Sequence, residues 1–283
     1  MLNPVAFKIF SHDIRWYGIM VATGVLAGYF LMQKNRKYAD LSQEQVADIC
    51  FFSMISGVLG ARIFYVIEFF QYFQYKIVNG MQVKRQFGEM LLEMIRIDKG
   101  GIVFYGGFIG AVVTLFIYCR LKKLNFLRVF DMMAPSLALG HAFGRIGCLI
   151  NGCCYGKIAH WGIHYPNLHI YGQCAGTTRI PVQLFESLIN FLLAVILHFS
   201  LKKLKPGQVI SLYCILYGTV RFLDEFLRGD NTRFFLGIFT PGQAVGLFVI
   251  PIGIAIFFYL AKRAKSAESE LVEKGADNAE AGK

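Results

Sequence analysis

The stretch "HAFGRIGCLINGCCYG", from His141 to Gly156, holds an arginine, a histidine, three cysteines and four glycines directly after an apolar run. His141 and Arg145 are four residues apart, so they share one face of a continuous helix. Gly144 and Gly147 remove side-chain bulk beside the arginine. A guanidinium in a pocket lined by glycine suits bidentate recognition of a phosphate or a carboxylate. This stretch therefore predicts an anion-binding pocket.

A second group of charges lies in "YGTVRFLDEFLRGD". Arg221 and Glu225 are four residues apart and Arg228 is three further on, so we expect all three on one helical stripe. The Arg221–Glu225 pair could simply satisfy itself, which would be a structural role. A further arginine beside the pair leaves surplus positive charge, and this again indicates an anion. Two arginine centres at similar depth, around Arg145 and Arg221, favour a phospholipid headgroup.

Two other arginines leave the choice between structure and function open. Arg15 stands with Trp16 and Tyr17 in "DIRWYG", where an interfacial anchor and a functional group are both compatible with the sequence. Arg62 lies in "GVLGARIFYVIEF", and an ionisable residue inside a span is costly unless it is paired or hydrated. It is therefore a snorkelling arginine, a structurally paired one or a functional one.

The seven cysteines raise the question of a metal site or a disulfide. The C-x4-C-C spacing of Cys148, Cys153 and Cys154 fits no standard ligand pair, and adjacent cysteines rarely both bind one metal, so we expect no metal site. A disulfide between Cys174 and either Cys153 or Cys154 is the alternative, because their loop should face an oxidising compartment. The remaining cysteines lie in apolar segments and are expected to be small packing residues: Cys50, Cys119 and Cys214.

The elements that must position these residues are membrane helices. The chain is 55% hydrophobic and only 17% charged, and its apolar residues lie in long runs. Soluble domains carry about a quarter charged residues, so we expect an all-α integral membrane protein. The net charge of +11 could indicate nucleic acid, but the basic residues cluster in alternate loops between the apolar runs. That pattern is typical of loops facing the cytoplasm, so no nucleic-acid partner is expected.

About seven transmembrane helices are predicted, each close to the ~20 residues needed to cross the hydrocarbon core. The expected spans are residues 17–31, 46–70, 101–119, 130–150, 182–201, 209–226 and 243–261. The basic loops place the amino terminus outside and the carboxyl terminus in the cytoplasm. We expect one transmembrane domain over residues 1–263 and a disordered cytoplasmic tail over residues 264–283. In the outer loop, "GEMLLEMIRID" predicts an amphipathic helix on the bilayer surface.

Several blocks occur together and in order: "RWYG", "GARIFYV", "GGIVFYGGFIGA", "GRIGCLINGCCYG", "PVQLFE", "YGTVRFLDEFLR" and "PGQ". With these blocks the sequence resembles, over nearly its whole length, the prolipoprotein diacylglyceryl transferases. These are seven-span bacterial enzymes that lipidate the lipobox cysteine of secreted precursors. The resemblance implies a catalytic domain in the bacterial cytoplasmic (inner) membrane and no cofactor. It implies phosphatidylglycerol, lipobox-containing prolipoprotein precursors and membrane lipids as partners.

The resemblance also implies a reaction, in which the precursor's cysteine thiolate attacks the glyceryl carbon of phosphatidylglycerol. A thioether forms and glycerol-1-phosphate leaves, so cations must stabilise the leaving phosphate. The expected catalytic residues are Arg145, Arg221, Tyr105, His141 and Glu225. The expected substrate-binding residues are Arg145, Arg221, Arg228, Tyr17, Asn151, Gly156, Gln183 and Glu186.

Three positions depart from the family pattern: Tyr105 replaces the usual histidine, Cys148 the usual asparagine, and Cys153 an often acidic residue. A tyrosine with an ordinary pKa near ~10 is a poor base at neutral pH, so Tyr105 is expected to hydrogen-bond to lipid phosphate instead. His141 is then the candidate base, or it only hydrogen-bonds within the bundle. The departures leave open an inactive lipid-binding homologue, and the buried charges and cysteines leave open a membrane transporter or a thiol-redox membrane protein.

Overall fold

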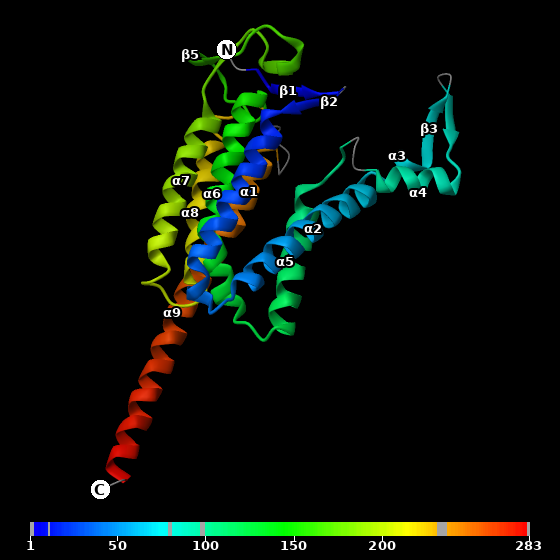
Figure 1. Cartoon of the computed structure of the whole chain (residues 1–283). Coiled ribbons are helices and arrows are strands. Elements are labelled where there is room, and N and C mark those ends of the chain that lie inside the picture. The colour runs from blue at the N-terminus through cyan, green and yellow to red at the C-terminus, as the bar shows by residue number, and fades with distance from the viewer. Residues whose placement is uncertain (1–2, 11, 79–80, 97–99, 231–236, 282–283) are drawn as a thin grey trace. The chain divides into compact units, whose positions relative to one another are not determined.

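The computed structural model describes residues 3–10, 12–78, 81–96, 100–230 and 237–281 (Figure 1). It divides into two compact units, one of Met1–Asp40 with Leu127–Lys283 and one of Leu41–Phe126. The long helices of the first unit are α1 (Trp16–Asn35), α6 (Phe126–Asn151), α7 (Val182–Ser200), α8 (Gln208–Asp224) and α9 (Pro241–Ala281). The second unit is built on α2 (Gln43–Glu68) and α5 (Phe104–Leu121).

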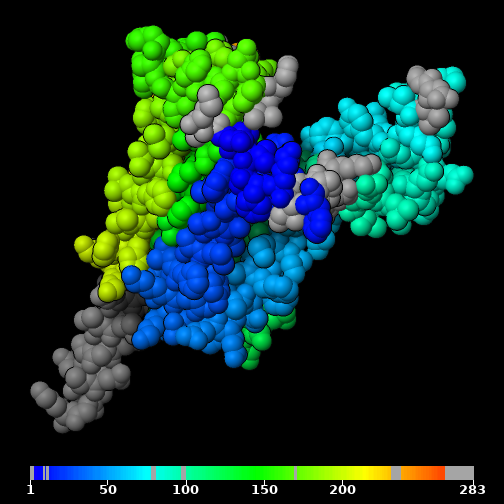
Figure 2. Space-filling view, turned by 45° about the horizontal axis from the view of Figure 1, so that its top comes forward, coloured from blue at the N-terminus to red at the C-terminus, as the bar shows by residue number. Residues whose placement is uncertain are grey.

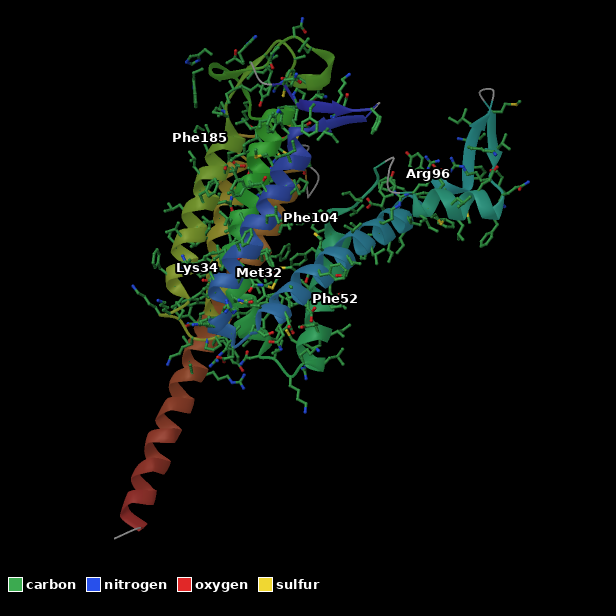
Figure 3. The ribbon with its side chains drawn as sticks, viewed as in Figure 1. Met32, Lys34, Phe52, Arg96, Phe104 and Phe185 are labelled. Atoms are coloured by element: carbon green, nitrogen blue, oxygen red, sulfur yellow. The ribbon has the colours of Figure 1, made fainter. Side chains whose placement is uncertain are left out.

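Short strands cover one end of the first unit's helices. An antiparallel hairpin of β1 (Val5–Ile9) and β2 (His12–Arg15) leads directly into α1. The connection between α6 and α7 contains β5 (Ile158–His164), the 3-10 helix η2 (His169–Cys174) and β6 (Thr178–Arg179), and β5 pairs antiparallel with β6. Figure 2 shows this connection, in green, as a cap over the end of the helices. The labelled Phe185 of α7 lies toward that end, whereas Lys34 of α1 lies toward the other (Figure 3).

Small residues bring α1 against α6. A Cβ added at Gly24 would lie 2.9 Å from the carbonyl oxygen of Gly140, and one at Gly28 would lie 3.3 Å from that of Ser136. Membrane helices pack through such small residues, because close backbone contact replaces the hydrophobic driving force that lipid does not provide. The contact fixes the two helices that carry Tyr17 and Arg145.

A buried carboxylate ties α6 to the start of α8. Asp131, which is 0% exposed, accepts hydrogen bonds at Oδ2 from the Gly207 amide at 2.6 Å and the Tyr38 hydroxyl at 3.1 Å. Its Oδ1 accepts from the Ile210 amide at 2.8 Å. A helix leaves its first amides without intrahelical partners and carries partial positive charge there, so this carboxylate caps α8 from a different helix.

The second unit settles the role of Arg62. Gly107 of α5 packs on Gly57 of α2, where an added Cβ would lie 3.0 Å from the Gly57 carbonyl oxygen. The Arg62 guanidinium donates to four carbonyl oxygens at 2.8–2.9 Å, those of Glu93, Met94, Gly100 and Gly101. Arg62 is therefore paired structurally, and it binds both the last turn of α4 (Phe87–Ile95) and the two glycines that precede α5.

The all-α membrane fold expected from the sequence is confirmed. Six helices of the described chain are long and apolar enough to cross a membrane: Trp16–Ala39, Gln43–Glu68, Phe104–Leu121, Phe126–Asn151, Val182–Ser200 and Pro241–Ala264. The sixth predicted span coincides with α8, which has 17 residues. Seven spans, an outer amino terminus and a cytoplasmic carboxyl terminus stay predictions. The predicted domain over residues 1–263 and the tail from residue 264 likewise stay predictions, and that boundary falls within α9.

The segment of the second unit between α2 and α5 contains α3 (Phe70–Gln74), a hairpin of β3 (Tyr75–Val78) and β4 (Met81–Lys84), and α4. The helix expected in "GEMLLEMIRID" is present as α4, and its Phe87, Leu92 and Ile95 are exposed. Its placement on a bilayer surface stays a prediction.

Candidate functional site

Buried charges from α6 and α7 meet inside the first unit. Glu186, near the start of α7, is 1% exposed, and its Oε1 lies 2.9 Å from Arg145 Nη2 and 3.2 Å from His141 Nε2. Arg145 Nε also donates to His141 Nε2 at 3.0 Å, so the two share one helical face as predicted. Glu186 thus holds both side chains of α6 from the facing helix.

The surroundings of His141 restrict its chemistry. Its Nε2 has the Arg145 Nε donor at 3.0 Å, the Glu186 oxygen at 3.2 Å and the Tyr217 hydroxyl at 3.3 Å. A ring nitrogen carries either a lone pair or a hydrogen, so Nε2 cannot accept from Arg145 and donate to Glu186 at once. A role as base therefore requires Arg145 to release the Nε2 lone pair first.

Arg221 of α8 forms the second arginine centre. Its Nη2 lies 2.5 Å from Glu225 Oε1, as the four-residue spacing predicted, and its Nη1 lies 3.6 Å from Asp224 Oδ2. Nη1 is buried and has no hydrogen-bond partner among the described residues. Glu186 interacts electrostatically with Arg221 as well as with Arg145, so one carboxylate links the two centres.

The start of α9 holds Glu225 in place. Thr240 and Gln243 form reciprocal side-chain-to-amide hydrogen bonds of 3.3 and 3.2 Å, a capping box that begins the helix with a proline at its first position. The glycine between them, Gly242, packs on the Glu225 carboxylate, and an added Cβ would collide with it. The "PGQ" block therefore has a local physical reason, which is to let α9 approach the Arg221–Glu225 pair.

Arg228 does not share the predicted helical stripe, and that expectation is wrong. The helix α8 ends at Asp224, and Arg228 instead forms an antiparallel bridge with Gly156 in the α6–α7 connection. Its Nε and Nη2 lie 2.9 and 2.7 Å from the two carboxylate oxygens of Asp230. Arg228 therefore has a carboxylate of its own, in addition to its electrostatic interaction with Glu225.

The remaining predicted binding residues line the same end of the first unit. Tyr17 packs on Gly147, whose added Cβ would lie 3.2 Å from Tyr17 Cδ2, while an added Cβ at Gly144 would meet nothing within 4 Å. Asn151 is the last residue of α6 and is half-buried. Gln183 is 1% exposed and donates to the Cys153 carbonyl at 2.9 Å. The pocket predicted next to Arg145 stays a prediction.

Comparison with known proteins places this site in a family. The family model described as prolipoprotein diacylglyceryl transferase matches residues 4–259. The chain belongs to this family. It is 33% identical over 266 residues to the phosphatidylglycerol–prolipoprotein diacylglyceryl transferase of Clostridium tetani, covering 90% of this chain and 97% of the relative.

Two further relatives with the same name are similar to this chain over nearly its whole length. The enzyme of Finegoldia magna is 34% identical over 259 residues, covering 90% of this chain and 94% of the relative. The enzyme of Staphylococcus haemolyticus is 33% identical over 279 residues, covering 97% of this chain and 93% of the relative. The resemblance drawn from the sequence blocks is therefore confirmed, as are the membership in a transferase family and the membrane helices.

The departures from the family pattern fall in both units. Tyr105 belongs to the second unit, where it is 55% exposed near the start of α5, and its hydrogen bond to lipid phosphate stays a prediction. Cys148 and Cys153 lie in the first unit, at the end of α6 and just beyond it. Hydrogen bonds with the Cys148 and Cys153 thiols, followed by the positive charge of Arg145 and Arg228, lower the pKa of Cys154.

All seven cysteines are free thiols in this structure, so the disulfide considered for Cys174 is not formed. Cys174 is buried with Tyr155, Tyr165 and Tyr171, and its Sγ lies 3.4 Å from the Gly152 carbonyl oxygen. Burial raises the pKa of the Cys174 thiol to about 11, which keeps it protonated at neutral pH. Cys174 is therefore a packing residue of the cap.

Sequence reasoning missed two side chains of the polar centre, Tyr217 and Asp224. Tyr217 precedes Arg221 by four residues and Asp224 follows it by three, so helical spacing could have placed both beside that arginine. Spacing alone could not have linked Tyr217 to His141, because that contact joins α8 to α6.

Proposed function

We propose that this chain transfers the diacylglyceryl group of phosphatidylglycerol to a prolipoprotein. The observation that carries the proposal is a buried polar centre with two arginines, in which Arg221 Nη1 has no hydrogen-bond partner among the described residues and lies 3.6 Å from the nearest carboxylate oxygen of Asp224. A buried donor without a partner is costly, and an anionic headgroup would satisfy it. Relatives named for this reaction match along almost their whole length, which supports the same assignment.

The reaction exchanges one bond at the glyceryl carbon for another. The lipobox cysteine thiolate of the precursor attacks that carbon, a carbon–sulfur bond forms, and the carbon–oxygen bond to phosphate breaks. The products are a thioether-linked prolipoprotein and glycerol-1-phosphate, and the thiol proton passes to a base. Holding both substrates in one orientation supplies part of the acceleration, because it replaces a bimolecular encounter by an aligned one.

Arg145 and Arg221 stabilise the charge that collects on the leaving phosphate. Both are preorganised by carboxylates, Arg145 by Glu186 at 2.9 Å and Arg221 by Glu225 at 2.5 Å. Donors that are fixed before the reaction act strongly in a site of low dielectric, since they need no reorganisation during it. Glu186 and Glu225 are on this view positioning residues, which orient the two guanidinium groups.

Arg145 also couples lipid binding to the state of His141. When its Nε turns to a phosphate oxygen, the lone pair on His141 Nε2 is released and becomes able to accept a proton. The base would therefore form only when the anionic lipid is bound. Tyr217, 3.3 Å from the same nitrogen, keeps the ring in place during the exchange.

The site belongs to a multi-pass membrane protein, so both substrates reach it from the bilayer and its surface. We place the enzyme in the bacterial cytoplasmic (inner) membrane, where lipoprotein biosynthesis joins membrane lipids to lipobox-containing precursors. We assign the remaining predicted binding residues of the first unit to the headgroup and its approach: Tyr17, Asn151, Gly156, Gln183 and Arg228.

The direct test uses the purified full chain in lipid nanodiscs with labelled phosphatidylglycerol and a lipobox peptide. We expect glycerol-1-phosphate and the thioether peptide in equal amounts. Arg221→Gln is expected to lower kcat/KM by about 10²–10³, the effect of removing one donor to a developing anion. Arg120→Gln is the matched control, because Arg120 is exposed at the end of α5 and stacks on Phe116.

Two outcomes would decide against the proposal. Lipid binding without any product, from protein that is correctly inserted, would instead favour an inactive lipid-binding homologue, a reading prompted by the departures at Tyr105 and Cys148. Equal losses in Arg221→Gln and Arg120→Gln would mean that the buried centre is not where the phosphate is held.

A further inference from the structure

Three cysteine sulfurs converge at the end of α6. Cys148 lies in the last turn of the helix, and Cys153 and Cys154 follow directly after it. The three Sγ atoms all lie within 4.8 Å of one another. Cys148 is buried and the other two are half-buried. The proposed transfer reaction gives these three thiols no role.

The backbone explains how adjacent cysteines face the same point. Gly152 has φ +71° and Cys154 has φ +55°, both in the left-handed region. In an extended chain successive side chains point in opposite directions, but these turns fold the chain back over the end of α6. The Cys153 amide donates to the Cys148 carbonyl at 3.1 Å, which closes the turn. The sequence expectation that adjacent cysteines would not both bind one metal did not include this conformation.

The backbone of Cys154 is strained. A non-glycine residue in the left-handed region costs roughly 1–2 kcal/mol, and such strain is concentrated at functional sites. The neighbouring positions hold the turn firmly, because Gln183 donates to the Cys153 carbonyl at 2.9 Å and Cys174 packs on the Gly152 carbonyl at 3.4 Å. A turn of this kind, maintained by its surroundings, directs the three thiols toward one another.

We propose that Cys148, Cys153 and Cys154 form a binding site for a soft divalent cation with a filled d shell, of the zinc class. Three thiolates around such an ion with metal–sulfur bonds of about 2.3 Å lie about 3.8 Å apart. Sulfurs within 4.8 Å reach that spacing when each moves inward by roughly 0.6 Å, a small side-chain rotation. Thiolate sulfur is the preferred ligand of soft cations, so oxygen-seeking ions such as magnesium would not compete.

The charges around the cluster favour the loaded form. Three thiolates and one divalent cation leave a net charge of −1. Arg145 is also paired with Glu186, and Arg228 with Asp230. Both guanidinium groups nevertheless act electrostatically on Cys154, and their positive charge favours an anionic complex beside it. Binding displaces thiol protons into solution, as is general for cysteine ligands. The fourth position of a tetrahedral ion stays open to a water or an external thiol.

The test uses the reduced full chain in detergent, freed of metal and titrated with Cd²⁺ alone. Cadmium–thiolate bonds absorb in the near ultraviolet, so we expect a saturable band with one ion per chain and its loss on addition of excess Zn²⁺. Cys148→Ser and Cys154→Ser are each expected to weaken binding about tenfold or more. Cys214→Ser is the matched control, since Cys214 is half-buried in α8 and outside the cluster.

Thermal unfolding of each variant without metal separates loss of binding from loss of fold. Cys153→Ser provides a third ligand variant in case either of the others fails to fold. No saturable band, or a band of equal strength in Cys148→Ser and in the parent, overturns the proposal. Free thiols are also counted before reduction. If two are missing and the protein binds Cd²⁺ only after prolonged reduction, the cluster normally holds a disulfide, and the proposal is overturned. None of these readouts depends on lipid transfer.

Discussion

Replacing Glu186 by glutamine removes one buried negative charge and keeps the shape of the side chain. The carboxylate oxygen lies 2.9 Å from Arg145 Nη2 and 3.2 Å from His141 Nε2. Without it the Arg145 guanidinium stays buried and loses its closest carboxylate. Removing one partner of a buried ion pair costs about 3–5 kcal/mol. For a domain of this size that corresponds to a fall in unfolding temperature of roughly 6–20 °C.

The same substitution should make the protein more responsive to anionic lipid. Phosphatidylglycerol would supply the counterion that Glu186→Gln removes, so it is expected to raise the unfolding temperature more in the variant than in the parent. Zwitterionic phosphatidylcholine, with no net negative charge to offer, should raise both equally. Fluorescence-detected unfolding in detergent, with each lipid added separately, measures both effects.

A surface carboxylate provides the control. Glu89 pairs with Lys76 at 2.7 Å on the exposed side of α4, where solvent screens the interaction, so Glu89→Gln should leave the unfolding temperature unchanged. An unchanged unfolding temperature in Glu186→Gln would refute the assignment of Glu186 as the counterion of Arg145. An equal gain from phosphatidylglycerol in variant and parent would refute the exchange of that counterion for lipid.

Three further substitutions test other parts of the structure. His141→Ala should lower lipidation at saturating lipid, and near-parental product formation would dismiss His141 as the base. Asp131→Ala removes the cap of α8 and should destabilise the protein by about 2–4 kcal/mol in thermal unfolding, while the folded fraction keeps its activity. Gly242→Ala forces a methyl group against the Glu225 carboxylate and should reduce glycerol-1-phosphate release, whereas Gly88→Ala, with nothing within 4 Å, should not.

Features that depend on helical periodicity and on hydropathy could be predicted from the sequence. His141 with Arg145 and Arg221 with Glu225 are pairs four residues apart, and both occur as expected because one turn of helix fixes their separation. Helices also occur at every predicted span, because long apolar runs have few alternatives in lipid. These features depend on neighbours within a single element.

Contacts between distant elements could not be predicted in the same way. The partner of Arg145 is Glu186, 41 residues away along the chain and on another helix. Arg228 leaves the expected stripe because the segment after α8 pairs with the α6–α7 connection, where the Lys157 amide donates to the Leu227 carbonyl at 2.9 Å. The convergence of the cysteines depends on a left-handed turn at Cys154, which no spacing rule encodes.

The carboxylate of Asp131 has a consequence for how the protein is made. The fourth predicted span, α6, carries Asp131, His141 and Arg145, so it is poorly suited to enter lipid alone. It is synthesised before α8, whose first amides are the partners of Asp131. We therefore expect α6 to remain at the translocation channel until α8 emerges and the two to partition into the bilayer together. On this view, the hydrogen bonds of the Asp131 carboxylate determine when α6 enters the bilayer as well as how α6 packs against α8.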